Sequence, residues 1–298
     1  MKKLLFLLNP CAGTRKANRY MTDIIDIFNR AGYEVTTYVT ACQGDCIRMA
    51  AECGTDKDLI VCCGGDGTFN ELVAGMLQAG LQNPIGYIPA GSTNDFAASM
   101  GIPTDILKAA KLCVTGKPIA CDIGEFGGRP FSYVASFGIF TRSSYATSQS
   151  VKNALGHAAY VLGGIQELGQ IKTTHVRLEL ADGSVLEDDY LFGAISNATS
   201  VGGILTLNPK RVDMHDGKLE LLLIRAPKDL GELTDCIVKL QRQEYNSAMV
   251  TFVSTPSVQV YSNGTLDWSL DGEKAQSDGA VMVECLHNAI RVVKEEKA

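Results

Sequence analysis

Strand and helix signals alternate along the chain as far as Thr115. Short, almost uninterrupted apolar runs, such as KLLFLLN at 3–9 and DLIVCC at 58–63, predict strands that are buried on both faces. Amphipathic stretches that end at glycine, such as 15–31, predict helices between them. Strands joined through helices form right-handed crossovers, and these build a parallel sheet. The expected strands are 3–9, 33–40, 58–63 and 84–89, and the expected helices are 15–31, 45–53, 68–79, 94–100 and 105–115.

The pattern changes after Gly116, where strand-like segments with period two follow one another. Turn signals separate them at Gly127-Gly128, Asp182-Gly183, Asp216-Gly217 and Asn263-Gly264. Two helical stretches, 150–168 and 228–243, interrupt this pattern. Such a succession of short strands predicts a mostly antiparallel β-sandwich.

The fold class expected from these patterns is therefore α/β, with two domains. A parallel-sheet nucleotide-binding domain occupies 1–120, and the β-sandwich domain occupies 121–298. The last residues of the sandwich domain could pack back on the first domain.

Charge and hydropathy exclude several classes of protein. The net charge of −6 argues against a general nucleic-acid binder, which needs clustered lysine and arginine. No stretch approaches the roughly 18 apolar residues of a membrane span, and the apolar run after Lys2-Lys3 ends at Asn9-Pro10 without a cleavage site for a signal peptide. We expect a cytoplasmic protein without a transmembrane segment.

Ten cysteines are present, and two of them, Cys62 and Cys63, are adjacent in the strand at 58–63. Disulfide frameworks are typical of small secreted chains, and this chain is long and shows no sign of secretion. Cys42 and Cys46 are not followed by a second pair at the spacing of a zinc site. We expect most of these cysteines to be small buried hydrophobic residues, with a metal or redox role as the less favoured alternative.

The segment Gly64-Gly65-Asp66-Gly67 joins the strand at 58–63 to a helix. Thr68 and Glu71 have the spacing of a capping box, which would start that helix next to Asp66. Helix N-termini attract phosphate, glycine allows a ligand to approach the backbone, and aspartate can hold magnesium. A tight turn without a ligand explains the same residues, so this segment alone leaves both interpretations open.

Two more loops of this kind follow other strands, at 9–16 (NPCAGTRK) and 89–95 (PAGSTND). Loops that follow parallel strands lie at one edge of the sheet, where α/β proteins bind ligands. The aspartates Asp66 and Asp95, together with Arg15 and Lys16, predict a nucleotide-phosphate site there. Neither the Rossmann fingerprint nor the P-loop sequence occurs in these loops.

The segments NPCAG (9–13), GGDGTFNEL (64–72) and PAGSTNDFA (89–97), in this order and spacing, resemble the diacylglycerol-kinase catalytic domain family. Among its members, the chain is most similar to the bacterial soluble lipid kinases, and the resemblance extends over nearly its whole length. GGDG alone is less specific, since NAD kinases and phosphofructokinases share it.

The resemblance implies an ATP-dependent lipid kinase, with ATP and Mg2+ as cofactors and a lipid substrate at a membrane surface. It implies that Asp66 and Asp95 position the catalytic magnesium. The residues that it assigns to nucleotide binding are Asn9, Pro10, Cys11, Ala12, Gly13, Thr40, Gly64, Gly65, Asp66, Gly67, Thr68, Phe69, Asn70 and Thr93.

Two motifs of the second half also match the family. In Leu270-Asp271-Gly272-Glu273, the family's general base corresponds to Glu273, although the same letters describe a hairpin turn. The segment 213–218 resembles a structural magnesium site, with the Asp216 carboxylate and mainly backbone oxygens of Asp213 and Lys218 as ligands. An Asp-Gly turn is the alternative for this segment.

Two other functions remain open at this point: an NAD-kinase-like enzyme, which would phosphorylate a nucleotide hydroxyl, and a non-catalytic nucleotide or lipid sensor on the same fold. The sequence does not choose among diacylglycerol, phosphatidylglycerol, sphingoid bases and polyprenyl alcohols as acceptors. The resemblance also suggests a homodimer and transient peripheral association with a membrane.

Overall fold

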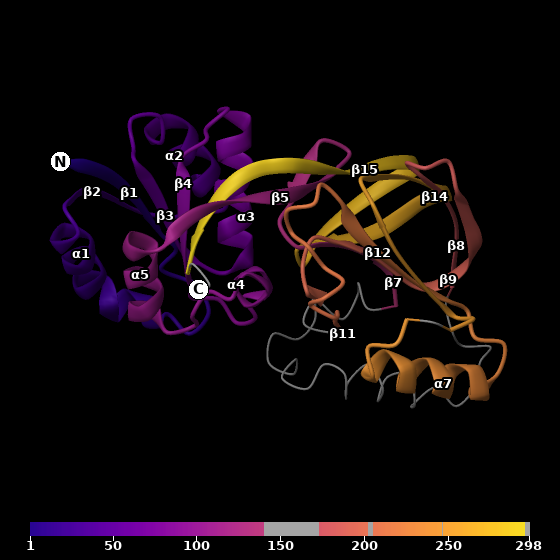
Figure 1. Ribbon diagram of the computed structural model, residues 1–298. Coiled ribbons are helices and arrows are strands. Elements are labelled where there is room, and N and C mark those ends of the chain that lie inside the picture. Colours follow the sequence, from indigo (N-terminus) through magenta and orange to yellow (C-terminus); the bar gives the residue numbers. More distant parts are fainter. Residues whose placement is uncertain (140–172, 202–204, 246, 296–298) are drawn as a thin grey trace. The chain divides into compact units, whose positions relative to one another are not determined.

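The structure is a computed structural model that describes residues 1–139, 173–201, 205–245 and 247–295 (Figure 1). The chain divides into two compact units: Met1–Ile123 with His287–Ala298, and Gly124–Leu286. Strands β5 (Lys117–Phe126) and β15 (Glu273–Lys294) contribute residues to both units. Within the described residues, no helix is long and apolar enough to cross a membrane.

The first unit is built on a parallel sheet with the strand order β4-β3-β1-β2. Its strands are β1 (Lys2–Leu8), β2 (Tyr33–Val39), β3 (Leu59–Gly64) and β4 (Pro84–Pro89). Every residue of β3 is buried, as its apolar sequence predicts for a central parallel strand. Near its end, β15 pairs in parallel with β4 through Arg291 and Val292.

Helices cover both faces of this sheet (Figure 1). Helix α1 packs with α5 and helix α2 with α3. The helices are η1 (Lys16–Tyr20), α1 (Met21–Arg30), α2 (Asp45–Cys53), α3 (Asp66–Gln78), α4 (Asp95–Met100) and α5 (Ile106–Thr115). The single helix expected at 15–31 is thus two helices, because Tyr20 leaves helical geometry (φ −100°, ψ 5°) between a 3₁₀ turn and α1.

The second unit is an antiparallel sandwich with the strand order β13-β12-β9-β7-β14-β15, in which β8 pairs with both β14 and β9. The two-stranded pair β10-β11 is separate. Besides β5 and β15, its strands are β6 (Arg129–Phe131), β7 (Val134–Gly138), β8 (Thr174–Leu180), β9 (Val185–Ser196), β10 (Ser200–Val201), β11 (Leu205–Thr206), β12 (Leu219–Arg225), β13 (Val250–Thr255) and β14 (Ser257–Leu270).

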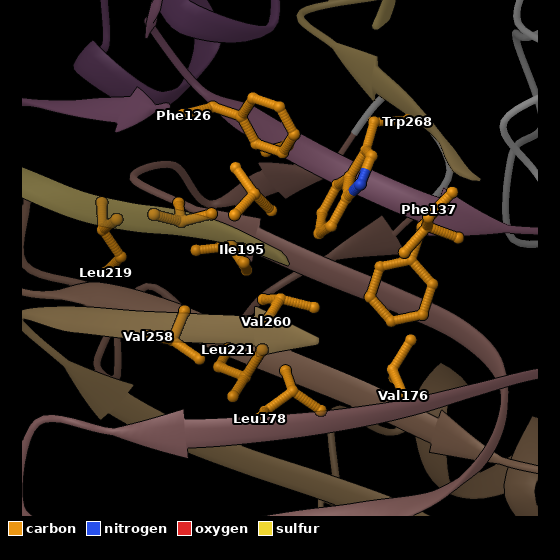
Figure 2. Close-up of a cluster of buried hydrophobic side chains, with 14 of the residues drawn as sticks. Phe126, Phe137, Val176, Leu178, Ile195, Leu219, Leu221, Val258, Val260 and Trp268 are labelled. Carbon is orange, nitrogen blue, oxygen red and sulfur yellow. The ribbon is translucent and has the colours of Figure 1, made fainter. Parts of the chain in front are cut away.

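The core of the sandwich surrounds Trp268, which is fully buried (Figure 2). Phe126 and Phe137 approach its ring edge-on, with centroids 4.9 Å and 5.0 Å away. The indole Nε1 donates to the Ser277 hydroxyl at 2.9 Å, so its polar group is satisfied inside the core. A second cluster lies between the sheet and helix α7 (Leu230–Gln241), so β12 is buried on both faces.

One turn expected in this half is not a turn in the structure. Asn263-Gly264 does not end a strand: β14 runs through it and pairs with β15 on both sides, with a register shift between Tyr261 and Thr265. Gly264 has φ +83°, so the Asn-Gly pair forms a bulge instead of a hairpin turn, because the partner strand continues beside it. The helix expected at 150–168 lies outside the described residues.

Cys62 and Cys63 are both fully buried in β3. Burial raises the pKa of the Cys63 thiol to about 12, so it stays protonated at neutral pH. Both side chains therefore pack in the core of the first unit.

Candidate functional site

Asn9 connects the loop after β1 to the first turn of α3. Its Nδ2 donates to the Thr68 hydroxyl at 2.9 Å, and its Oδ1 accepts from the Cys11 backbone N–H at 2.9 Å. The Asn9 backbone N–H donates to the Cys63 carbonyl at 2.9 Å. The loop at 9–13 is thereby held against the GGDG segment.

Glycines let three loops pack backbone to backbone. A Cβ added to Gly13, which has φ +50°, would lie 2.3 Å from the carbonyl oxygen of Ala90. A Cβ added to Gly91 would lie 2.6 Å from the Cα of Gly65. The structure therefore brings together the loops at 9–13, 64–67 and 89–95, and it shows a reason for these glycines that needs no ligand.

The predicted capping box is wrong. Helix α3 begins at Asp66, with Gly65 as N-cap and no side-chain cap. The Thr68 hydroxyl accepts from Asn9 instead, and Glu71 Oε1 accepts from the Gly44 backbone N–H at 2.9 Å. Both side chains tie α3 to neighbouring loops, because the helix starts two residues earlier than the sequence pattern indicated.

Asp66, the first residue of α3, accepts hydrogen bonds from the first turn of α4. Its Oδ2 accepts from the Asp95 backbone N–H at 3.1 Å, and its Oδ1 accepts from the Phe96 backbone N–H at 3.3 Å. Asn94 precedes the helix with φ +56° and caps nothing; its amide bonds both the N–H and the carbonyl of Gly91, at 2.9 Å and 3.0 Å. Asp66 thus satisfies two of the backbone N–H groups that the first turn of α4 leaves without a partner inside the helix.

Asp66 and Asp95 form a pair of largely buried acids. Burial, followed by the negative charge of Asp95, raises the pKa of Asp66 to about 6. Hydrogen bonds from backbone N–H groups oppose this rise. When both carboxylates are charged, their repulsion destabilises the folded state, and a cation bound to both would reduce that repulsion.

The other predicted nucleotide-site residues lie at the same edge and differ in how exposed they are. Thr40 follows β2, and its backbone N–H donates to the Leu8 carbonyl at 2.9 Å, which places it beside the first loop. Thr93 and Gly67 are exposed.

Some of the predicted residues could contact a nucleotide only through their backbone. The Phe69 ring is fully buried and stacks on Phe96 with centroids 4.2 Å apart, so only its backbone could reach a nucleotide. Pro10 and Cys11 are partly or fully exposed, whereas Ala12, Thr68 and Asn70 are buried.

In the second unit, Glu273 is the first residue of β15. Its Oε2 accepts a hydrogen bond from a terminal guanidinium nitrogen of Arg129 on β6, and the two form an ion pair. Sequence reasoning missed Arg129, because 144 residues separate it from Glu273.

Asp271, two residues before Glu273, holds the segment that follows β6. Its Oδ2 accepts from the Ser132 backbone N–H at 2.5 Å, and its Oδ1 accepts from those of Tyr133 and Val134 at 3.0 Å each. Asp271 is buried and has φ +50°. A carboxylate with three backbone donors stabilises two chain segments at once.

We expect Asp271→Asn to lower the free energy of unfolding by about 2–4 kcal/mol, because the amide turns a donor toward buried N–H groups. Urea unfolding of the purified variant measures this loss. Asp182→Asn is the matched control, since Asp182 is exposed and accepts from the Ser184 N–H at 2.9 Å; its loss should stay below about 0.5 kcal/mol. Equal losses in the two variants would contradict the role of Asp271.

The segment 213–218 forms a turn in the second unit. Asp213 Oδ1 accepts from the His215 backbone N–H at 3.1 Å, and Asp216 Oδ1 accepts from the Lys218 backbone N–H at 3.0 Å. Among the described residues, no group of three or more His, Cys, Asp or Glu side chains is arranged to hold a metal ion. A cation at this turn would therefore need backbone oxygens and water.

Glu220, which sequence reasoning missed, is buried near this turn. Its Oε2 is buried without a hydrogen-bond partner within the part of the chain that the structure describes. Burial, followed by the charge of Asp216, raises the pKa of Glu220 to about 8. An acidic residue among the leucines of β12 was the only available sequence signal.

Comparisons with known proteins agree with this architecture. The family model described as the diacylglycerol kinase catalytic domain matches residues 3–126, and the one described as the YegS C-terminal NAD kinase beta sandwich-like domain matches residues 134–294. A diacylglycerol kinase of Bacillus subtilis is 31% identical over 300 residues, covering 100% of this chain and 98% of the relative. The chain belongs to the diacylglycerol kinase family. This confirms the resemblance, the fold class and the assignment to the lipid kinases that the sequence predicted.

Other members of the diacylglycerol kinase family show the same likeness. The diacylglycerol kinase of Staphylococcus carnosus is 31% identical and covers 91% of this chain and 89% of its own. A solved diacylglycerol kinase structure from Bacillus anthracis aligns with a TM-score of 0.77 at 21% identity, over 99% of this chain and 97% of that one. Another structure from the same organism gives a TM-score of 0.83 at 23% identity, with the same coverage. At these identities the two structures support the fold alone.

Proposed function

We propose that this protein transfers the γ-phosphoryl group of ATP to the hydroxyl of a diacylglycerol or a closely related lipid. Family membership supports the kinase class and the use of ATP. The observation that carries the proposal is the junction of three loops, in which Asp66 and the buried Asp95 adjoin the loops at 9–13 and 64–67, where Cys11, Gly13 and Gly67 are exposed.

ATP would bind at this edge of the parallel sheet in the first unit. Backbone N–H groups of the loops at 9–13 and 64–67 would hold its phosphates. Arg15 and Lys16 are exposed at the end of the first of these loops and would offset phosphate charge. Thr40 and Thr93, at the same edge, would contact the nucleotide.

A magnesium ion fits the donor set at Asp66 and Asp95, because burial and then the Asp95 charge raise the pKa of Asp66, and a hard cation prefers carboxylate oxygens. When bound, magnesium would neutralise charge on the transferred phosphoryl group. The chain's own contribution is to hold the Asp66 carboxylate in place beside Asp95, through the backbone N–H groups of Asp95 and Phe96.

The acceptor hydroxyl would be activated by Glu273 in the second unit. The oxygen of the acceptor hydroxyl forms a new bond to the γ-phosphorus, while the bond from that phosphorus to the β,γ-bridging oxygen breaks. ADP leaves with that electron pair, and the hydroxyl proton passes to the Glu273 carboxylate. The products are a phosphorylated lipid and ADP.

A second cation is proposed at the turn 213–218, with the Asp216 carboxylate and backbone oxygens of Asp213 and Lys218 as ligands. The orphaned Oε2 of Glu220 lies beside the turn. The charges of Asp216 and Asp213 add to burial in raising the pKa of the Glu220 carboxyl, and a cation at the turn would offset those charges. The chemistry of this donor set suits a hard cation such as magnesium.

Magnesium should stabilise the protein more at pH 7.5 than at pH 5. The pKa of Asp66 in the folded protein, about 6, lies above the ordinary aspartate value of 3.8. Its contribution to stability is therefore present below pH 4 and is lost as the pH rises through 6, where the carboxylate becomes charged. The rise in Tm on adding Mg2+ should appear above pH 6 and shrink below it, and Asp66→Asn should show a small rise at both pH values. An equal rise in the wild type at pH 5 and pH 7.5 would contradict this site.

A panel of acceptors tests the proposed function. The protein is incubated with labelled ATP, Mg2+ and, separately, micelles of diacylglycerol, phosphatidylglycerol, sphingosine or a polyprenol, or NAD in solution. We expect label in diacylglycerol or a related lipid. Label in NAD alone would favour the NAD-kinase-like alternative, and no transfer to any acceptor would favour a non-catalytic sensor.

Work at a lipid surface implies transient peripheral association with a membrane from the cytoplasm, and we propose a homodimer on the strength of the family resemblance. Vesicle flotation measures the first property, and sedimentation measures the second.

A further inference from the structure

Arg129 forms an ion pair with Glu273. A terminal guanidinium nitrogen donates to Glu273 Oε2, and both residues belong to the second unit. The side chains are 42% and 39% exposed, so an acceptor arriving from solvent could reach both.

Most ion pairs at a protein surface contribute little to the free energy of folding, because their long side chains move freely. Here the backbone is fixed on both sides of the pair. Asp271 lies two residues before Glu273, and it accepts from the N–H groups of Ser132, Tyr133 and Val134, which begin three residues after Arg129. The buried Asp271 carboxylate therefore holds together the two backbone segments that carry Arg129 and Glu273. This distinguishes the pair from an ion pair between two freely moving surface side chains.

This arrangement has two consequences for a general base. The carboxylate must lie within hydrogen-bond reach of the acceptor hydroxyl, and a fixed guanidinium restricts its rotamers to one orientation. The guanidinium is also permanently charged. A positive group carried by the acceptor next to its hydroxyl would be repelled by Arg129, whereas a neutral acceptor would not.

We propose that Arg129 is the positioning residue of Glu273 and that its charge selects acceptors with no positive charge beside the reacting hydroxyl. The inference rests on the proposed role of Glu273 as general base. With Arg129 in this role, the protein should phosphorylate a neutral acceptor such as diacylglycerol in preference to an amino alcohol such as sphingosine.

A double-mutant cycle tests the positioning role with wild-type protein, Arg129→Ala, Glu273→Ala and the double variant. With diacylglycerol micelles, Arg129→Ala should lower kcat by about tenfold with the KM for ATP within about twofold. In the Glu273→Ala background, the same change should lower kcat by less than about twofold, because Arg129 then has no base to position. Arg129→Lys should recover part of kcat, since it keeps the charge without the planar fork.

The ratio of kcat/KM for diacylglycerol to that for sphingosine gives a second readout. Arg129→Ala should lower this ratio about fivefold or more, because removing the cation leaves the Glu273 charge uncompensated. A merely structural arginine would change both acceptors equally. Arg177→Ala serves as control, since Arg177 is an exposed residue of strand β8 in the same unit and pairs with Glu179 at 2.7 Å; its kcat and its ratio should match the wild type.

The outcomes separate the two claims. If Glu273→Ala keeps wild-type kcat, the base assignment fails and the role of Arg129 falls with it. If Glu273→Ala loses activity while Arg129→Ala keeps both kcat and the acceptor ratio, the inference about Arg129 alone is overturned. Thermal unfolding of each variant, with Arg129→Lys as the milder change, excludes loss of fold as the cause.

Discussion

Glu273→Gln is expected to lower kcat by about 10²–10⁴-fold and to leave the KM for ATP within about twofold. Glutamine has almost the volume of glutamate and can still accept the hydrogen bond from Arg129 through its Oε1. It cannot take up the proton of an acceptor hydroxyl. The loss should therefore fall on the chemical step, and initial rates with labelled ATP and diacylglycerol micelles measure it.

Glu284→Gln provides the control for this prediction. Glu284 is an exposed carboxylate on the same strand, β15, where its residue pairs with Ser257. This variant should keep the kcat of the wild type. If Glu273→Gln retained more than about one fifth of the wild-type kcat, a positioned general base would be excluded and the proton would have to leave by another route.

Gly13→Ala is expected to lower the free energy of unfolding by about 2–4 kcal/mol and to abolish nucleotide binding. The added Cβ would lie 2.3 Å from the Ala90 carbonyl oxygen, which belongs to the backbone and cannot rotate away. The positive φ of +50° adds a cost of about 1 kcal/mol for any residue with a Cβ. Thermal unfolding and calorimetric titration with ATP measure the two effects.

Gly80→Ala separates the contact from the backbone strain. Gly80 has φ +64°, but a Cβ there meets nothing within 4 Å. This variant should lose about 1 kcal/mol and bind ATP as the wild type does. Equal losses of stability in Gly13→Ala and Gly80→Ala would show that the three loops do not pack as described.

The sequence was sufficient to bring three distant loops to one place. In a parallel sheet the loops after β1, β3 and β4 must share an edge, so the prediction needed only the strand pattern and the positions of the glycines. The local hydrophobic pattern also sufficed for β3 and α2, whose apolar residues occupy the expected positions.

The roles of individual side chains at that edge could not be predicted in this way. Thr68 and Glu71 satisfied the local rule for a capping box, yet both bind other loops. The hydrogen bond from Asp95 N–H to Asp66 spans 29 residues, so no sequence window contains both ends. Contacts of this kind depend on tertiary packing, which overrides local preference.

The second unit shows the same limit. Asn263-Gly264 is a strong local signal for a hairpin, but β15 continues beside it and turns it into a bulge. The pairing of Arg129 with Glu273 and the three N–H groups on Asp271 became visible only when β6, β7 and the start of β15 were placed together. The motif Leu270-Asp271-Gly272-Glu273 indicated the position of the proposed base, Glu273, without its partners.

A competition assay tests the central claim most directly. The wild-type protein is given labelled ATP and Mg2+ in one vessel that contains both diacylglycerol micelles and NAD, and the lipid and aqueous phases are counted separately. Our account predicts label in the lipid phase, with the phosphorylated lipid appearing in step with ADP, and none above background in NAD. Label in NAD with an unlabelled lipid phase would contradict it.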